Sequence, residues 1–300
     1  MPSHPFLALA AMLLAGTASA SPFGNGKLLL TGGVSSIDGA AGGGLTPWAV
    51  TGSYATGSQV GATAFATRVR SQDYALSVAG AALGFGDRAE LSIARQDFDT
   101  GDNLAPLGLP GLHLKMNVFG AKLRLAGDAV LDSDSSMPQL AVGVLHKRTD
   151  AGALEPTLTG ALGARTRGTE LYLSATKLFL AQGVLVNGTL RATRANQGGL
   201  LGFGSAARDR YQLQPEVSVA WLLRRDLAIG AEVRAKPDNL NDSVLGAGAL
   251  KEDDWADVFI AWAPSKHLSL TLAVADLGRI APAVQPRRQR GAYLSAQIAY

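Results

Sequence analysis

The 300-residue sequence has no cysteine and few charged or aromatic residues. Without cysteine, neither disulfides nor thiolate metal sites can form. Charged residues make up 17% of the chain and hydrophobic residues 47%, whereas a typical soluble domain has roughly 25% charged residues. The 27 basic and 24 acidic residues are scattered rather than clustered, so the net charge of +3 gives no reason to expect a nucleic-acid partner.

Long apolar runs are also scarce, and the clearest lies at the N-terminus. A short run at 6–15 precedes Ala18-Ser-Ala20, a small-x-small cleavage motif. The run is too short for a transmembrane helix, which needs about 20 apolar residues. Residues 1–5 contain no Lys or Arg, so a retained anchor is the alternative. We expect residues 1–20 to be a cleaved signal peptide and 21–300 to be exported.

The exported part has the period of strands. Successive side chains of a strand point to opposite faces. Residues 217–223 place Val, Val, Trp and Leu on one face, and Gly, Ala, Ser and Thr dominate the opposite faces of such segments. A water-facing sheet would carry a denser cover of Lys, Glu and Asp. The same alternation recurs at 119–125, 184–191, 227–234, 257–262 and 268–274.

Connector length alternates between short and long, which is typical of the periplasmic turns and extracellular loops of a membrane barrel. The tight turns are at 84–88, 180–183, 224–226 and 264–266. The longer connectors are at about 99–112, 150–168, 195–210, 237–254 and 277–290. Hydrocarbon satisfies no backbone polar group, so only a closed sheet can cross it with strands. The sequence therefore predicts an all-β protein, with a single closed antiparallel transmembrane β-barrel in the outer membrane.

The strand count follows from this pattern. We predict thirteen strands at approximately 45–55, 59–70, 74–84, 88–98, 113–126, 137–149, 169–180, 183–194, 211–223, 226–236, 255–263, 267–276 and 291–300. A fourteenth, at 26–35, gives an even number and puts both termini in the periplasm. We therefore expect about 14 strands, within 12–16. The alternative is about twelve strands, with the Gly-rich segment 26–47 folded into the lumen as a plug.

The last ten residues form the predicted closing strand. Ile298 and Tyr300 share one face with other apolar residues, and Tyr293 lies on the more polar face. An aromatic C-terminus resembles the closing strand of outer-membrane barrels, which the barrel-assembly machinery recognises. We assign Tyr293, Ile298 and Tyr300 to this assembly signal and expect the strand to pair with the one near 27–35.

Charged residues on the faces opposite the apolar stripes are the candidate lumen-lining residues. A Lys or Arg facing lipid at mid-depth would cost about 2–4 kcal/mol, so the lumen is the favoured location. These side chains either form a salt-bridged network that closes the interior or set the electrostatics of a solute path. They are Lys122, Arg124, Arg191, Glu216, Glu232, Arg234 and Asp257.

Signals for catalysis or cofactor binding are weak. The Gly-rich run 32–44 lacks the following Lys and helix of a phosphate loop. His113, His146 and His267 share no local motif with a nucleophile and a carboxylate. The acidic clusters at 132–134 and 252–254 lack the spacing of a calcium loop. We expect no enzyme activity, no cofactor and no metal site.

A resemblance covers nearly all of the exported chain. The motif 26–48, GKLLLTGGVSSIDGAAGGGLTPW, is similar to the opening of an uncharacterised proteobacterial family filed as a domain of unknown function. Later stretches are similar to the same family, at 87–92, 122–128, 137–143, 253–267 and 276–278. The resemblance implies a secreted, single-domain outer-membrane β protein and carries over no catalytic residue or ligand.

Three functions are compatible with these patterns. The first is a passive channel or transporter for small or apolar solutes. The second is a structural or adhesive barrel whose lumen is closed by the charge network. The third is a membrane-embedded hydrolase, for which the histidines provide no convincing triad. The expected partners are outer-membrane lipid, the barrel-assembly machinery and a solute that the sequence does not identify.

Overall fold

A computed structural model describes residues 27–57, 59–130 and 135–300, so the predicted signal peptide and the acidic cluster at 132–134 lie outside the described residues. Twelve antiparallel strands form a closed barrel. They are β3 (Val60–Ser71), β4 (Ala75–Phe85), β5 (Ala89–Asp99), β6 (His113–Ala126), β7 (Gln139–Asp150), β8 (Arg167–Phe179), β9 (Val184–Thr193), β10 (Gln212–Arg224), β11 (Leu227–Arg234), β14 (Trp255–Ser265), β15 (Leu268–Asp276) and β16 (Arg290–Ala299).

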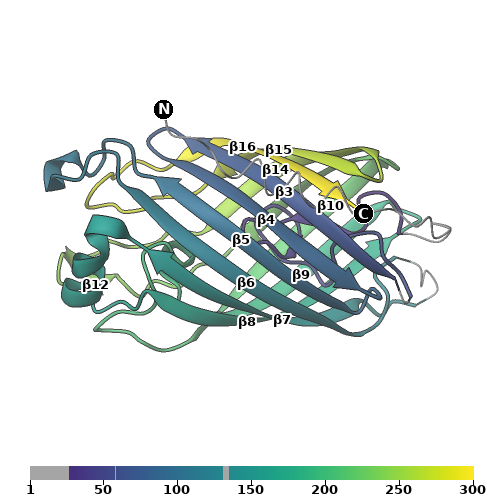
Figure 1. Ribbon diagram of the computed structural model, residues 1–300, viewed down its shortest axis with the longest axis horizontal. Coiled ribbons are helices and arrows are strands. Elements are labelled where there is room, and N and C mark those ends of the chain that lie inside the picture. Colours follow the sequence, from purple (N-terminus) through teal and green to yellow (C-terminus); the bar gives the residue numbers. More distant parts are fainter. Residues whose placement is uncertain (1–26, 58, 131–134) are drawn as a thin grey trace.

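Each strand pairs with its neighbour in the chain, and β16 closes the barrel against β3 (Figure 1). Most short connectors gather at the end that carries Tyr300, which we call the inner end; the described parts of the longer connector 127–138 lie there too. The other long connectors gather at the opposite, outer end, together with the short turn 72–74, and include most of the short elements. These are η1 (Ala105–Leu107), η2 (Gly152–Leu154), η3 (Thr157–Ala161), η4 (Asn196–Gly199), β12 (Asp242–Ser243) and β13 (Gly246–Ala247).

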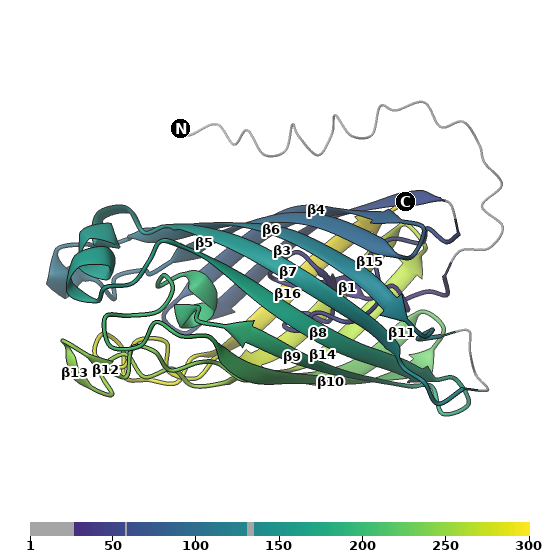
Figure 2. The ribbon, with the colours of Figure 1, turned by 90° about the horizontal axis from the view of Figure 1, so that it is seen from below.

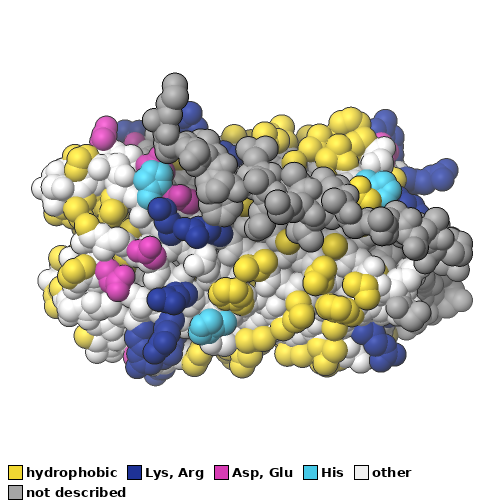
Figure 3. All heavy atoms as spheres, in the orientation of Figure 1, with side chains coloured by type: hydrophobic (Ala, Val, Ile, Leu, Met, Phe, Trp, Pro, Cys, Tyr) yellow, Lys and Arg dark blue, Asp and Glu magenta, His cyan; other side chains and the backbone are white. Residues whose placement is uncertain are grey.

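The wall has the two-faced pattern that the sequence predicts. Large apolar side chains such as Ile93, Phe119, Leu173 and Leu272 are exposed on its outside. Such side chains on all twelve strands form an apolar belt around the wall, and Figure 3 shows part of it on one face, between the two ends of the barrel. Polar and charged side chains of the opposite parity are buried inside. Among the residues described, no helix is long and apolar enough to cross a membrane.

Two of the predicted strands are wrong, and with them the preferred count of fourteen. Residues 27–57 form no wall strand but lie inside the barrel towards its inner end, where β1 (Val34–Ser35) pairs with β2 (Ala41–Gly42) (Figure 2). The partner expected for β16 near 27–35 is likewise wrong, because β3 takes that place. Pro47 and Gly52 weaken a strand, and nearly every residue from 30 to 53 is buried, whereas a wall strand exposes alternate residues.

Candidate functional site

The interior of the barrel is occupied by residues 27–57, which we call the plug. Its backbone bonds to side chains from around the wall. The carbonyl of Pro47 accepts a hydrogen bond from Thr189 Oγ1 at 2.8 Å, and the amide of Ala49 donates to Thr176 Oγ1 at 2.8 Å. On the other side of the lumen, Ser35 Oγ donates to Gln297 Oε1 at 2.7 Å. Buried backbone groups need partners, and the polar lumen face of the wall supplies them.

Asp38 of the plug is the centre of a buried charge cluster. Its carboxylate lies 2.8 Å from Lys147 Nζ and 2.9 Å from Arg234 Nη1. Its third basic neighbour is Arg191, whose Nη1 atom is 3.7 Å away. Glu170 and Glu216 complete the cluster, which then holds three acidic and three basic side chains and has a formal charge of zero.

The two remaining acids of the cluster come from the wall. Glu170 Oε2 lies 2.8 Å from Lys147 Nζ and 3.0 Å from Arg191 Nη1. Glu216 Oε1 lies 2.5 Å from Arg191 Nε and 3.4 Å from Arg234 Nε. All six side chains are almost fully buried. Removing one member would leave an uncompensated buried charge, which is strongly unfavourable.

Two further polar contacts hold the plug to opposite sides of the wall. Glu232 on β11 accepts hydrogen bonds from the Leu45 amide at 2.7 Å and from Thr46 Oγ1 at 2.6 Å. On β6, Lys122 Nζ donates to the carbonyls of Ala41 and Val50, both at 2.8 Å. The charged side chains inside the wall therefore bind the plug and do not line an open channel.

Glu90 of β5 belongs to the Lys122 contact. It lies 3.3 Å from Lys122 Nζ and accepts hydrogen bonds from the amides of Ala41 and Gly52. At the inner end, Arg124 is partly exposed and pairs with Asp87 at 2.5 Å. Asp257 is buried opposite Glu232, and its carboxylate oxygens have no hydrogen-bond partner among the described residues.

Six of the seven residues predicted to line the lumen are thus buried inside the barrel, and Arg124 lies at its inner end. The sequence reasoning missed Asp38, Glu90, Lys147 and Glu170. Strand parity could have revealed the three wall residues, since each shares its face with other buried positions. Nothing in the Gly-rich run around Asp38 marks it as an ion-pair partner.

The outer end of the lumen is covered by loops. The η4 turn bends inwards, where Lys147 Nζ donates to the carbonyl of Gly198 at 3.0 Å and Thr149 Oγ1 to that of Gly199 at 2.6 Å. Glu252, in the connector between β11 and β14, accepts from the Gln197 amide at 2.8 Å and pairs with Lys236 at 3.0 Å. The charge cluster therefore lies between the plug and η4.

An apolar cavity of about 400 Å³ lies between the plug and the outer loops. Ile37 and Leu45 of the plug line it together with the strand residues Val69, Leu114 and Ala275. The outer loops contribute Leu104, Leu107, Leu109, Leu154, Leu158, Leu162, Leu200, Leu201, Leu245, Leu250, Leu277, Ile280, Ala281 and Val284. No charged residue is among those that line the cavity.

The polar groups at this cavity are few. Thr100, Thr157 and Gln197 line it, together with Tyr74, Trp255 and Tyr293, whose aromatic side chains each carry one polar group. The Tyr293 hydroxyl and the Trp255 indole N–H are buried and have no hydrogen-bond partner among the described residues. A mostly apolar cavity with a few convergent polar groups is the usual form of a small-molecule site.

One ion pair joins two of the loops at the outer end. Arg279 donates to Asp253 from Nε at 2.9 Å and from Nη2 at 3.0 Å. This bidentate contact lowers the pKa of the Asp253 carboxyl to about 2. It links the connector at 235–254 to the one at 277–289, both of which contribute lining residues to the cavity.

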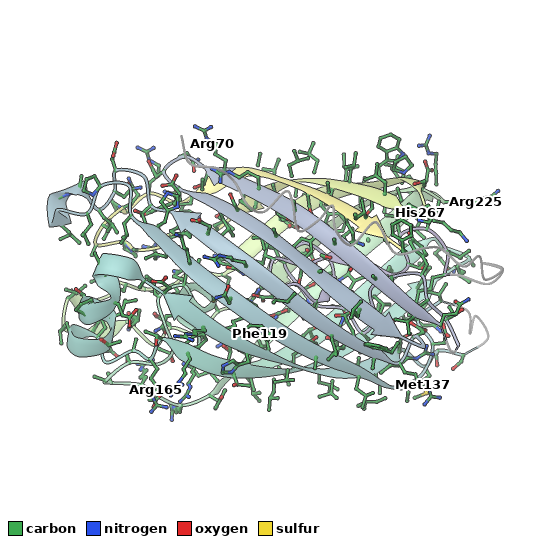
Figure 4. All side chains as sticks on the ribbon, in the orientation of Figure 1. Arg70, Phe119, Met137, Arg165, Arg225 and His267 are labelled. Carbon is green, nitrogen blue, oxygen red and sulfur yellow. The ribbon has the colours of Figure 1, made fainter. Side chains whose placement is uncertain are left out.

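The histidines lie apart from one another. His113 Nδ1 contacts Asp97 Oδ1 at 2.5 Å, and His146 Nδ1 contacts Thr169 Oγ1 at 3.0 Å, both near the outer end. His267 is at the inner end beside Tyr300, with ring centroids 4.8 Å apart (Figure 4). Within the described part of the chain, no group of three His, Asp or Glu side chains could hold a metal ion.

The residues assigned to the assembly signal fall on both faces of β16. Tyr293 is buried in the lumen, where it lines the cavity. Ile298 and Tyr300 are exposed on the outside. Their role in assembly remains a prediction.

Comparison with known sequences gives one family. Residues 31–297 match the profile of a family described as protein of unknown function, DUF3034. No curated protein matches the chain.

Comparison with solved structures gives outer-membrane barrels. The NanC porin has a TM-score of 0.50 and 7% identity, over 79% of this chain and 98% of that one. The KdgM porin has a TM-score of 0.49 and 10% identity, over 79% and 99%. Outer membrane phospholipase A from Escherichia coli has a TM-score of 0.43 and 11% identity, over 88% and 97%. At these identities the similarity concerns the fold alone.

Proposed function

Since the chain belongs to the DUF3034 family, whose description assigns no function, we propose its role from its own geometry: an outer-membrane barrel that takes up a small apolar solute through the cavity at its outer end. The fold is that of an outer-membrane β-barrel, and the apolar belt fits a bilayer. The expected partners remain outer-membrane lipid and the assembly machinery that reads β16.

The cavity is the observation that carries the proposal. Its lining is dominated by aliphatic side chains of loops and strands, and its volume of about 400 Å³ suits a small ligand. Soluble sugars or ions would lose their hydration there without gaining polar partners. An apolar solute gains roughly 25 cal/mol for each Å² removed from water.

A permanently open pore does not fit the interior. The plug and η4 occupy the lumen below the cavity and are hydrogen-bonded to the wall. Passage therefore requires the plug to move. Hydrogen bonds and ion pairs tie it to the wall, and water can take the place of these partners when the segment leaves the lumen.

The alternative is a barrel that transports nothing and uses its interior charges only for rigidity. The neutral six-residue cluster around Asp38 favours this reading. It does not account for the apolar cavity, which a purely structural barrel has no need to keep unfilled. For the same reason we propose binding and passage rather than catalysis, and the separately partnered histidines support this choice.

Binding to the cavity can be tested through Trp255, which lines it. In a protein with the outward-facing Trp221 and Trp262 changed to Phe, the remaining fluorescence comes from Trp48 in the plug and from Trp255. A brominated alkane should quench the Trp255 part of it, and this quenching should saturate. Trp255→Phe should remove the saturable part. Quenching that never saturates, or that survives Trp255→Phe unchanged, would show partition into detergent and contradict the proposal.

A further inference from the structure

A row of three arginines and one asparagine crosses the outside of four neighbouring strands, β5 to β8, beside the outer edge of the apolar belt. The strand register places Arg95 opposite Asn117, Asn117 opposite Arg148, and Arg148 opposite Arg167. On its strand, each of the four residues alternates with buried residues, so its side chain points to the outside of the barrel. Figure 3 shows Lys and Arg side chains gathered beside the edge of the belt on the side of the outer end.

Arg148 and Arg167 form the unusual part of this row. They are directly opposed on β7 and β8, and both are exposed. Like charges placed opposite each other on adjacent strands are destabilising. Neither has an ion-pair or hydrogen-bond partner within the described ranges. The repulsion between the two guanidinium groups destabilises the barrel alone. An anion between them would be attracted by both groups and would offset this repulsion.

The positive charge is confined to this row and does not continue into the rows on either side. The next row towards the outer end contains Asp97, Lys115 and Asp150, which are opposed in register and alternate in sign. The next row towards the belt contains Phe119, His146 and Thr169. The Arg95–Arg167 row itself therefore contains three guanidinium groups and no carboxylate.

The depth of the row identifies the class of anion. Phe119 and Ile93 of the belt are two residues from Asn117 and Arg95, which is about 7 Å along a strand. Leu171 of the belt lies four residues from Arg167 on the same strand. The guanidinium groups are thus at the level where apolar surface gives way to water, which is where lipid headgroups lie. Arg matches phosphate oxygens bidentately.

We propose that Arg148 and Arg167, assisted by Arg95, bind the phosphate group of a lipid in the outer leaflet, whose acyl chains lie along the belt over β5–β8. The side chains bind from the outer surface, independently of the cavity and the plug. The lipid occupies a defined position on one side of the barrel rather than the whole circumference.

Native mass spectrometry of the purified full chain with bisphosphorylated lipid A tests this site. We expect a retained lipid adduct, and Arg148→Gln/Arg167→Gln should weaken its binding about tenfold or more, because two charge-assisted contacts are lost. Arg224→Gln/Arg225→Gln removes the same charge at the inner end and should change binding little. Heat-modifiable migration on gels verifies that each variant is folded.

Three outcomes would overturn the proposal. Equal weakening by both double variants would show that only net charge matters. Equal binding of dephosphorylated lipid A would exclude phosphate recognition. Competition by inorganic phosphate at the same concentration as the lipid would show a site for the free ion instead. None of these outcomes bears on solute binding in the cavity, so failure here leaves the proposed function standing.

Discussion

The Asp38 carboxylate of the plug and the Arg234 guanidinium of β11 are 196 positions apart in the sequence and 2.9 Å apart in the fold. Through this contact a Gly-rich segment without long secondary structure is fixed inside a barrel. Asp38 also reaches Lys147 and Arg191, so a single acidic side chain connects the plug to β7, β9 and β11. We infer that Asp38 makes the main contacts that hold the plug in the lumen.

Replacing Asp38 with Asn should loosen the plug without opening the barrel. Lys147, Arg191 and Arg234 would then face only Glu170 and Glu216, and one buried positive charge would be left uncompensated. Breaking a buried pair in this way costs about 3–5 kcal/mol. Hydrogen exchange at the plug amides should therefore become at least about a hundredfold faster.

Asp242→Asn is the matched control for this experiment. Asp242 pairs with Arg208 in an outer loop, where both side chains are about half exposed, and exposed pairs contribute about 1 kcal/mol or less. In the Asp242→Asn variant, the amides of the plug should exchange as fast as in the unchanged protein. Equal exchange in Asp38→Asn and the unchanged protein would show that the plug is held by its other contacts.

Filling the cavity should abolish solute binding. Ala275 on β15 is buried and lines the cavity, so Ala275→Phe places a phenyl ring in that space without adding a tryptophan. Saturable quenching of Trp255 by a brominated alkane should fall about tenfold or more, because the ligand loses most of its apolar contact area. Leu272→Phe, on the lipid-facing side of the same strand, should bind as before. Unchanged binding in Ala275→Phe would place the solute elsewhere.

The loop clamp between Asp253 and Arg279 should depend on pH. The folded pKa of Asp253 is about 2, below the value of about 3.9 expected in an unfolded chain. The contribution of this pair to stability is therefore fully present above about pH 4 and is lost as the pH falls through about 2. Pepsin, which is active throughout this range, should cleave the 235–254 connector near pH 2 but not at pH 4.

Asp253→Asn should remove this dependence, since its connector should be cleaved at pH 4 as well. Asp226→Asn, in a turn at the inner end, serves as the control and should behave like the unchanged protein. If the connector of the unchanged protein resisted cleavage equally at both values, the ion pair would not be what holds it.

The end of β16 should matter for assembly more than for stability. Deleting Tyr300 removes an exposed aromatic that packs against His267 and two backbone hydrogen bonds to Ala62. Ile298 and the rest of the pairing with β3 and β15 remain. We expect less folded protein in the outer membrane of cells, but normal heat-modifiable migration after refolding in detergent. Equal amounts in the membrane would remove Tyr300 from the assembly signal.

Alternation along the chain was sufficient to predict the wall. All twelve observed strands correspond to predicted ones, because one face must meet hydrocarbon and the other a polar lumen. The same rule failed for 45–55, where Trp48 and Val50 alternate with Ala49 and Thr51 but all four residues are buried. Alternation of apolar residues indicates an extended segment with a buried face. It does not distinguish a strand of the barrel wall from a segment that is enclosed in the lumen.

The candidate site was only partly predictable. Parity indicates that Arg191 and Glu216 point inwards, but their partner Asp38 comes from a segment whose position depends on the whole barrel. The cavity is made by leucines from five separate loops, such as Leu104, Leu158 and Leu250. Each is an ordinary loop residue in the sequence, and only the closure of the barrel brings them together.

Solute passage past the plug is the central claim, and the absence of native cysteine allows a clean test of it. The hydroxyl groups of Thr46 in the plug and Ser218 on β10 are in direct contact, so Thr46→Cys/Ser218→Cys can form a disulfide that locks the plug. Thr67→Cys/Ser295→Cys is the matched control, because its hydroxyl groups are 2.7 Å apart on two wall strands.

The decisive measurement is uptake of the apolar dye N-phenyl-1-naphthylamine by intact cells that express each variant. The account predicts that the oxidised Thr46→Cys/Ser218→Cys protein gives no uptake above cells without the barrel, that reduction restores uptake, and that the control pair is unaffected by oxidation. Equal uptake through the locked and the reduced protein would contradict it.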